Sequence, residues 1–198
     1  MAPKDFPELF INSLTRNSSM SIRGIEMFCS YFSELLIKNY FLEDGAVSEK
    51  KGYIKKGCTR SFIIDEEGKE HILFFGFEDS WLYDHESFRF GKSGVQNIQA
   101  LEDTELLVIN RSDWFSLRNE IPGLALWQTE KVEKMTAEIM RLLTEIKCTP
   151  PEDRYLKLFA THPAIFQRIA LRHIASYLNI EPPSLSRIRR RIAKKNII

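Results

Sequence analysis

Residues 169–192 have the sequence IALRHIASYLNIEPPSLSRIRRRI, which predicts two short helices joined by a turn. In the first helix the apolar residues recur on one face, at Leu171, Ile174, Ala175 and Leu178. Residues 179–181 form a turn, and Pro182 suits the first position of a second helix. The buried face of that second helix is predicted at Leu185, Ile188 and Ile192.

The opposite face of the second helix carries hydroxyl and guanidinium groups. One stripe holds Ser184, Arg187 and Arg191, and Ser186 and Arg190 lie beside it. Arginine can bind guanine edges in the major groove with two hydrogen bonds, and serine and arginine can bind phosphates. The pattern therefore predicts a DNA-binding helix-turn-helix, with a plain helical hairpin bearing a charged face as the alternative.

The charge of the chain is unevenly distributed. The whole sequence has a net charge of +1, but residues 151–198 hold ten Lys or Arg and three Asp or Glu, a net charge of +7. The remaining residues hold 18 basic and 24 acidic side chains, a net charge of −6. A basic segment on an acidic body indicates that one part of the protein meets a polyanion. A solvated helical face with a disordered basic end is the alternative.

The composition is that of a globular protein. The 198 residues are 43% hydrophobic and 28% charged, which allows one ordinary domain or two small ones. Apolar runs are far shorter than the roughly 20 residues of a membrane span, and MAPKDFPELF has no apolar signal core. We therefore expect a cytoplasmic protein with no membrane partner. Three widely spaced cysteines, expected to be reduced thiols, are Cys29, Cys58 and Cys148.

The first segment is predicted to be helical up to about Asn39. Its apolar residues are spaced by three and four, at Ile25, Phe28, Phe32, Leu35 and Leu36. The cluster Asn17-Ser18-Ser19 predicts a break, and the pattern of residues 1–20 leaves their structure undecided.

Residues 40–110 are predicted to form strands and turns. Strand-forming residues gather at 53–54, 62–64 and 72–77, and Asp65-Glu66-Glu67-Gly68 predicts a hairpin loop. A second hairpin is predicted to pair Asn97–Leu101 with Glu105–Asn110. Short strands with closely spaced turns are typical of a compact sandwich or barrel.

Residues 122–147 have an apolar repeat of three and four, at Val132, Met135, Ile139, Leu142 and Ile146. This seam fits a helix packed on its own domain or a parallel dimer helix, and two to three heptads alone favour the former. A capping box at Thr149-Pro150-Pro151-Glu152 predicts a new helix and a domain boundary.

The sequence resembles the Crp/Fnr family of bacterial transcription regulators, and in particular a subgroup common in Bacteroidetes-type bacteria. The resemblance rests on the stretch HIASYL at 173–178, on Pro182, and on SLSRIRR at 184–190. Upstream stretches also match, at 56–61, 65–71 and 97–103. The resemblance implies an α+β protein: a cyclic-nucleotide-binding-like jelly roll over 1–121, a dimerisation helix over 122–148, and a winged-helix-like DNA-binding domain over 149–198.

The resemblance also implies the partners. These are double-stranded DNA read as an inverted repeat, a second copy of the chain, RNA polymerase and a small-molecule effector. Dimerisation is assigned to the seam residues, reversing the preference that periodicity gives. The expected DNA contacts are Arg168, Arg172, Ser184, Ser186, Arg187, Arg189, Arg190 and Lys194.

Two departures from the family pattern change these expectations. The Arg-Ser pair that cradles the cyclic phosphate matches Gly94-Val95 here, which offers no side-chain donor, so we expect no useful binding of cyclic AMP. Polar residues that could line a different ligand pocket, or be ordinary loop residues, are Asp84, Glu86, Gln96 and Asn97. Pro182-Pro183 replaces a base-reading Arg-Glu pair, so the preferred DNA sequence is expected to differ.

Other functions have little support in the sequence. Cys29 stands alone near the N-terminus, which argues against an iron–sulfur cluster, and the four histidines lack zinc-site spacing. No common catalytic motif occurs, so we expect neither an enzyme nor a resident cofactor or metal. Six residues follow Ile192, and we expect no complete wing hairpin there. The rival hypotheses are a ligand- or protein-binding sensor with degenerate DNA binding, and a constitutive DNA binder with an empty pocket.

Overall fold

The computed structural model describes residues 1–16 and 20–194 and divides into two compact units. Unit 1 comprises Met1–Ile63 and Phe74–Lys134, and unit 2 comprises Ile64–Leu73 and Met135–Ile198. The division falls inside the long helix α5 (Leu124–Cys148), whose two ends lie close to the predicted domain limits at 121 and 148. The predicted break at Asn17-Ser18-Ser19 lies outside the described residues.

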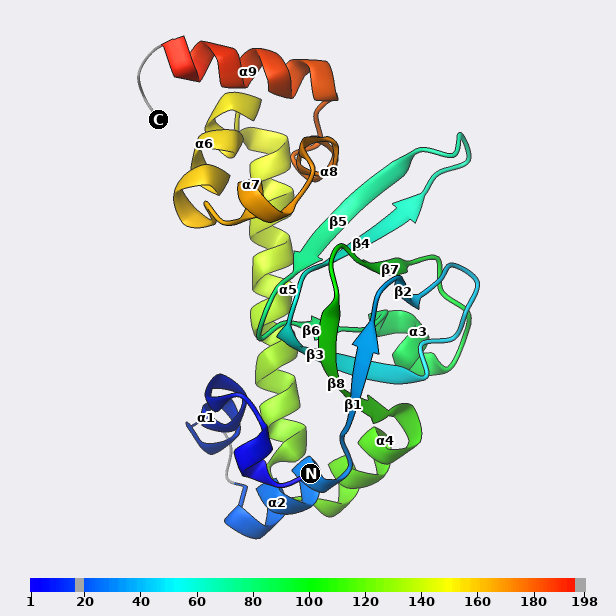
Figure 1. Cartoon of the computed structure of the whole chain (residues 1–198). Coiled ribbons are helices and arrows are strands. Elements are labelled where there is room, and N and C mark those ends of the chain that lie inside the picture. The colour runs from blue at the N-terminus through cyan, green and yellow to red at the C-terminus, as the bar shows by residue number, and fades with distance from the viewer. Residues whose placement is uncertain (17–19, 195–198) are drawn as a thin grey trace. The chain divides into compact units, whose positions relative to one another are not determined.

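Two four-stranded antiparallel sheets form the β-rich part (Figure 1). The first has the order β1-β8-β3-β6, with bounds Ser33–Ile37, Thr104–Asn110, Lys50–Lys56 and Trp81–Leu82. The second has the order β2-β7-β4-β5, with bounds Tyr40–Leu42, Asn97–Ala100, Thr59–Ile64 and Glu70–Gly76. One core cluster takes residues from both sheets: Ile37, Leu42, Ile54, Leu82, Ile98, Ala100, Leu106 and Val108. The fold is α+β, as predicted.

Strand β8 is buried on both faces. Leu106 and Val108 belong to the core between the sheets, whereas Leu107 and Ile109 belong to a second core beneath the helices of unit 1. This division follows from the alternation of side chains along a strand. The second core is rich in aromatic rings, including Phe10, Phe28, Phe32, Tyr53, Trp114 and Trp127.

The remaining described elements are helices (Figure 1). In unit 1 they are η1 (Pro3–Asp5), α1 (Glu8–Arg16), α2 (Ile22–Ser30), α3 (His85–Phe90), α4 (Arg111–Glu120) and the first turns of α5. In unit 2 they are the remainder of α5, α6 (Pro151–Thr161), α7 (Ile165–Arg168), α8 (Leu171–Tyr177) and α9 (Pro182–Lys194). Among the described residues, no helix is long and apolar enough to cross a bilayer.

The prediction that the first segment is helical as far as Asn39 is wrong. Helix α2 ends at Ser30, and Leu35 and Leu36 lie in β1, which pairs with β8 from Ser33↔Val108 to Ile37↔Thr104. The spacing of three and four continues by coincidence across the helix end. Pairing with β8 satisfies the backbone of 33–37 in the sheet, which a single-segment pattern cannot reveal.

The predicted hairpin between Asn97–Leu101 and Glu105–Asn110 is also wrong. Strand β7 pairs with β2 and β4, whereas β8 pairs with β1 and β3 in the other sheet. The connection crosses between the sheets at a close contact with Gly57, where φ is +117° and an added Cβ would lie 2.4 Å from Thr104 Oγ1. The Leu101 N–H donates to Cys58 O, at 2.8 Å, and fixes this corner.

The predicted capping box at Thr149 is wrong as well. Pro150 is the N-cap residue of α6 and makes no side-chain capping hydrogen bond, and Pro151 occupies the first turn. Glu152 instead forms an ion pair with Arg191, at 2.5 Å. The two prolines shift the start of the helix by one residue, because each fixes φ and lacks an N–H group.

Candidate nucleic-acid interface

The helix pair α8–α9 has the local structure predicted for residues 169–192, except that Leu171, predicted on the apolar stripe of the first helix, is 37% exposed. Ile174 and Ala175 of α8, and Leu185, Ile188 and Ile192 of α9, are all buried, with exposures of 0 to 5%. Asn179 adopts the left-handed conformation in the turn, with φ of 52°. Asparagine tolerates this region better than most residues, which explains a tight turn here without glycine.

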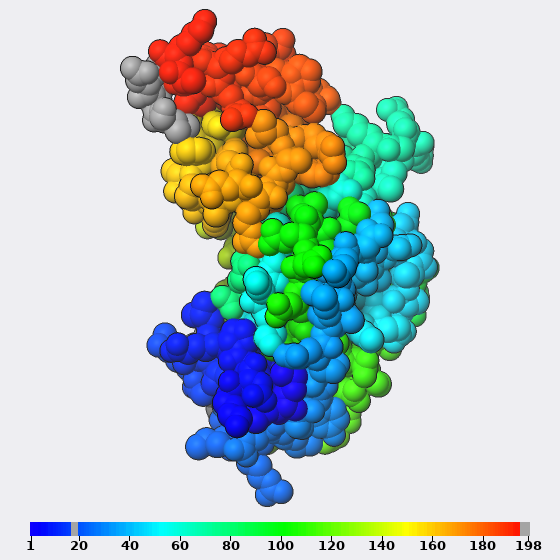
Figure 2. Space-filling model, viewed as in Figure 1, coloured from blue at the N-terminus to red at the C-terminus, as the bar shows by residue number. Residues whose placement is uncertain are grey.

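The outer face of α9 is open to solvent (Figure 2). Arg187, Arg189 and Arg190 are exposed, and Arg187 Nη2 donates to Ser184 Oγ at 3.0 Å. The Ser186 hydroxyl donates to Pro182 O, at 3.1 Å. The structure thus brings the half-buried Ser184 and the exposed Arg187 together on one stripe of α9.

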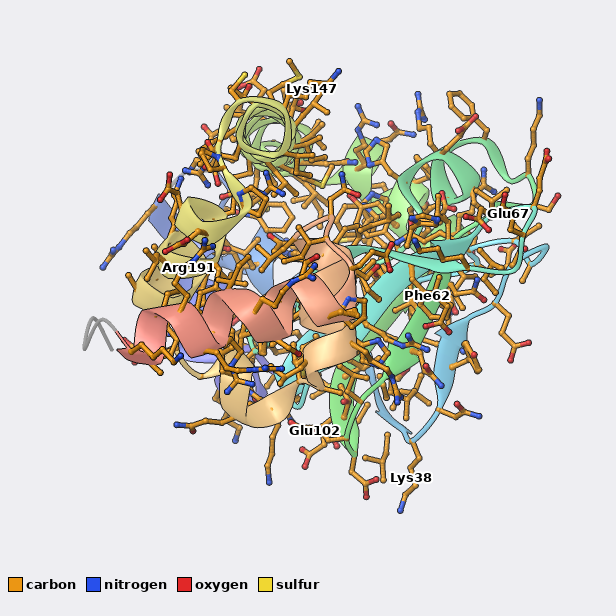
Figure 3. All side chains as sticks on the ribbon, turned by 90° about the horizontal axis from the view of Figure 1, so that it is seen from above. Lys38, Phe62, Glu67, Glu102, Lys147 and Arg191 are labelled. Carbon is orange, nitrogen blue, oxygen red and sulfur yellow. The ribbon has the colours of Figure 1, made fainter. Side chains whose placement is uncertain are left out.

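Arg191 is also exposed, but unlike Arg187 it is paired with a carboxylate. Its guanidinium pairs with Glu152 of α6, and Figure 3 labels Arg191 on α9. The pair links the last turns of α9 to the first turn of α6, although a half-exposed pair of this kind adds little stability. Sequence position alone placed Arg191 on the stripe of Ser184 and Arg187.

Arg154 is a structural residue that sequence reasoning counted only as a positive charge. It is 8% exposed, and its guanidinium donates to Ile146 O at 3.2 Å, Thr149 O at 2.5 Å and Leu178 O at 2.8 Å. These carbonyls lie at or just beyond the ends of α5 and α8, where the helix itself supplies no N–H donors. Arg154 therefore joins the end of α5 to the end of α8.

The tip of the β4–β5 hairpin, which belongs to unit 2, contacts the same helix pair. Ser176 Oγ of α8 accepts a hydrogen bond from Ile72 N, at 3.0 Å, and donates to Glu70 O, at 3.2 Å. Lys69 pairs with Glu181, immediately before α9, at 2.7 Å. These contacts hold both ends of the turn between α8 and α9.

The other predicted DNA contacts lie outside the exposed stripe of α9. Arg168 is the last residue of α7 and is half-buried, and Arg172 is exposed near the start of α8. Lys194 is exposed in the last turn of α9. Their predicted contacts with phosphate stay predictions.

No protein-family model and no curated protein sequence matches this chain. Solved structures, in contrast, do match this chain. The c-di-GMP-responsive global regulator CLP of Xanthomonas campestris gives a TM-score of 0.70 at 12% identity, covering 89% of this chain and 93% of that one. A transcriptional regulator described as Crp/Fnr family, from Eubacterium rectale, gives 0.70 at 15% identity, covering 96% and 88%. FixK2 of Bradyrhizobium japonicum gives 0.64 at 16% identity, covering 84% and 86%.

This chain has the Crp/Fnr fold. The similarity covers most of the chain, so the α+β fold that the sequence resemblance implied is confirmed, whereas the predicted domain bounds and the roles of the parts stay predictions. At these identities the similarity concerns the fold, and the residues of each site have to be judged from this chain.

Within the Crp/Fnr fold, the predicted dimerisation residues lie along α5. Of the five, Ile139 is 54% exposed, and Val132, Met135, Leu142 and Ile146 are half-buried. Two further apolar residues of α5, Met140 and Leu143, are 57% and 44% exposed. The described chain thus leaves an apolar surface around Ile139 uncovered, and part of it was missed by the heptad pattern.

The predicted ligand-binding residues make mostly local contacts. Asp84 caps α3 by accepting from Ser87 N at 2.9 Å, and Glu86 is exposed. Asn97 Oδ1 accepts from Asp44 N at 3.1 Å. The Nδ2 of Asn97 and the Nε2 of Gln96 are buried without a partner among the described residues, so each keeps a free donor.

Gly94 is the residue that the sequence resemblance matches to the phosphate-binding arginine of the family, and this match stays a prediction. A Cβ built there would lie 2.3 Å from Asp84 Oδ2. The backbone at Gly94 is held by hydrogen bonds with Ala46 O, at 3.1 Å, and with Gly45 N, at 2.9 Å. A side chain at this position would require the loop or Asp84 to move.

Proposed function

We propose that this protein is a sequence-specific DNA-binding transcription regulator of the Crp/Fnr type. The observation that carries the proposal is the face of α9: a helix whose buried side is anchored by Leu185, Ile188 and Ile192 and whose open side presents Ser184, Arg187 and Arg190. A helix fixed from behind can place arginine side chains against base edges without a large loss of conformational entropy.

Base reading falls to side chains that follow the two prolines at the start of α9. Pro182 and Pro183 occupy the start of the helix and have no N–H group, so this end offers fewer backbone donors to a phosphate than an ordinary helix N-terminus. We assign base contacts to Ser184, Ser186, Arg187 and Arg190, and phosphate contacts to Arg168, Arg172, Arg189 and Lys194.

The proposed active form is a dimer formed through α5. The uncovered apolar residues Ile139, Met140 and Leu143 support this assignment, because a second α5 would remove them from water. Two α9 helices about one DNA turn apart, roughly 34 Å, would then read an inverted repeat.

The sensor part is proposed to respond to something other than cyclic AMP. The contact between Gly94 and Asp84 supports this view, because it leaves no room for the arginine that the cyclic phosphate needs. RNA polymerase remains a proposed partner of the DNA-bound form.

Selection of bound duplexes from a random pool tests the function directly. We expect a recovered motif with two-fold symmetry that differs from the site of the catabolite activator protein. A pool that shows no enrichment in low salt would contradict the proposal and favour a sensor that has lost DNA binding.

A further inference from the structure

Unit 1 contains a cavity of about 190 Å³ between β3, the region of α3, α4 and the first turns of α5. Its apolar walls include the rings of Tyr83, Phe88 and Phe115. Its basic groups are Lys51, His85, Arg89 and Arg118, and among the described residues that line it Glu133 is the one carboxylate. Gln128 and Thr129 of α5 supply polar groups. The lining is therefore aromatic and carries an excess of positive charge.

Lys51 is the unusual member of this set. It is 3% exposed, and its Nζ lies 3.8 Å from the ring centroid of Trp114, 4.1 Å from that of Tyr83 and 4.7 Å from that of Phe88. No hydrogen bond or ion pair to this Nζ occurs among the described residues. Aromatic faces attract an ammonium group but do not replace a carboxylate, and buried lysines are ordinarily paired.

The surroundings of Lys51 disfavour its charged form. Burial, and secondarily the charge of Arg118, lower the pKa of Lys51 to about 7. Burial and the charge of Lys51 in turn lower the pKa of His85, against the opposing effect of Asp84. Burial is the main cause of both shifts, and the neighbouring positive charges lower the two pKa values further.

A second polar group in the cavity is also left unpaired. The Oε1 of Gln128 is buried and has no hydrogen-bond partner among the described residues. A buried amide group without a partner costs free energy that an occupant with a polar substituent would recover.

We propose that this cavity binds a small organic carboxylate with a flat ring, whose carboxylate pairs with Lys51 and Arg118. An apolar cavity of about 150 Å³ admits benzene, so the volume here accommodates a ring with a carboxylate. The ring packs against Phe88 and Phe115, and a polar substituent reaches Gln128. This site is separate from the predicted ligand residues Asp84, Glu86, Gln96 and Asn97, and it goes beyond the proposed DNA-binding function.

Calorimetric titration of the full chain with benzoate tests the proposal, with benzyl alcohol and acetate as matched probes. Benzyl alcohol keeps the ring without the charge, and acetate keeps the charge without the ring. We expect benzoate to bind at least about tenfold more tightly than either. At pH 8, titrations in two buffers of different ionisation enthalpy should reveal proton uptake, because the bound anion raises the pKa of Lys51.

The variant Lys51→Met should weaken benzoate binding at least about tenfold and abolish the proton uptake, while its flexible side chain still packs among the aromatic rings. Arg118→Gln should weaken binding without removing that uptake. Lys50→Met is the matched control, since Lys50 is the exposed neighbour on the same strand, and it should bind as the wild type does. Absence of benzoate binding at millimolar concentration, equal affinity for benzyl alcohol, or unchanged affinity in Lys51→Met would each overturn the proposal.

Discussion

Basic residues of equal formal charge have very different surroundings in unit 2. Arg154 is buried and donates hydrogen bonds to backbone carbonyls. Arg191 pairs with Glu152, and Lys157 pairs with Glu145. Arg187 is exposed, and among the residues that the structure describes its side chain bonds only to the neighbouring hydroxyl of Ser184. The net charge of the segment therefore overstates the charge available to DNA.

Replacement of Arg154 should destabilise the protein strongly. Arg154→Met leaves the carbonyl oxygens of Ile146, Thr149 and Leu178 without this donor, and we expect a loss of about 3 kcal/mol in the free energy of unfolding. Urea denaturation followed by circular dichroism measures it. Arg172→Met, an exposed arginine in α8, is the control and should change stability by less than about 0.5 kcal/mol. Equal stability of the two variants would contradict the conclusion that Arg154 stabilises the protein by joining the end of α5 to the end of α8.

Replacement of Arg187 should weaken specific DNA binding. For Arg187→Ala we expect a loss of about 1–3 kcal/mol on the selected site and a relaxed preference at the base it contacts. Arg191→Ala removes the same formal charge from the same helix, but its guanidinium faces Glu152, so its effect should be smaller. Gel-shift titration of both variants on one duplex gives the comparison, and an unchanged affinity of Arg187→Ala would contradict the assignment.

Lys51 should make stability increase with pH above neutrality. Its pKa is about 7 in the folded protein against 10.5 in its ordinary state, so between these values the unfolded chain binds the extra proton. The free energy of unfolding therefore rises with pH over this window, by at most about 1.4 kcal/mol per pH unit. Denaturation of wild type and Lys51→Met at pH 7 and pH 9 isolates this contribution. Identical slopes in the two proteins would place the pKa of Lys51 near its ordinary value.

At the scale of the element, α5 presents two different surfaces. Leu124 and Trp127 are buried in the core of unit 1, whereas Ile139, Met140 and Leu143 are left uncovered in the part of α5 that belongs to unit 2. The apolar repeat predicted from the sequence treats the whole of α5 as having one apolar face and does not separate these two surfaces. That is why the predicted seam contains half-buried residues such as Leu142 and misses Met140.

A charge at the uncovered surface of α5 should prevent dimerisation. Ile139→Glu would bury an unpaired carboxylate in the interface, so we expect monomers at micromolar concentration in sedimentation velocity experiments. Leu126→Glu is the control, because Leu126 is 54% exposed and lies thirteen residues earlier, on another side of a helix with about 3.6 residues per turn. A dimer that persists in Ile139→Glu would rule out this surface as the interface.

At the scale of the whole molecule, the proposed dimer predicts a steep salt dependence. Four phosphate contacts in each of two subunits give about eight, so log K should fall against log salt with a slope of about −7. Fluorescence anisotropy between 50 and 200 mM salt measures the slope, and Ile139→Glu should show about half of it. A shallow slope in the wild type would mean that fewer arginines reach the backbone than we propose.

The sequence by itself determined the helix pair α8–α9 and the α+β architecture. Local periodicity places Leu185, Ile188 and Ile192 on one face whatever surrounds them, and the resemblance to Crp/Fnr regulators supplied the order of the parts. The spacing of Phe10 and Leu14 by four could also have revealed the N-terminal helix α1, since both are buried.

Only the tertiary structure decided which partner each residue meets. Leu35 and Leu36 continue a helical spacing yet form a strand, because β8 provides backbone hydrogen bonds from distant sequence. The same holds for the assignment of β7 and β8 to different sheets, for the burial of Arg154, and for the isolation of Lys51 among aromatic rings. Each depends on contacts between residues far apart in the chain, and a local pattern carries no information about those contacts.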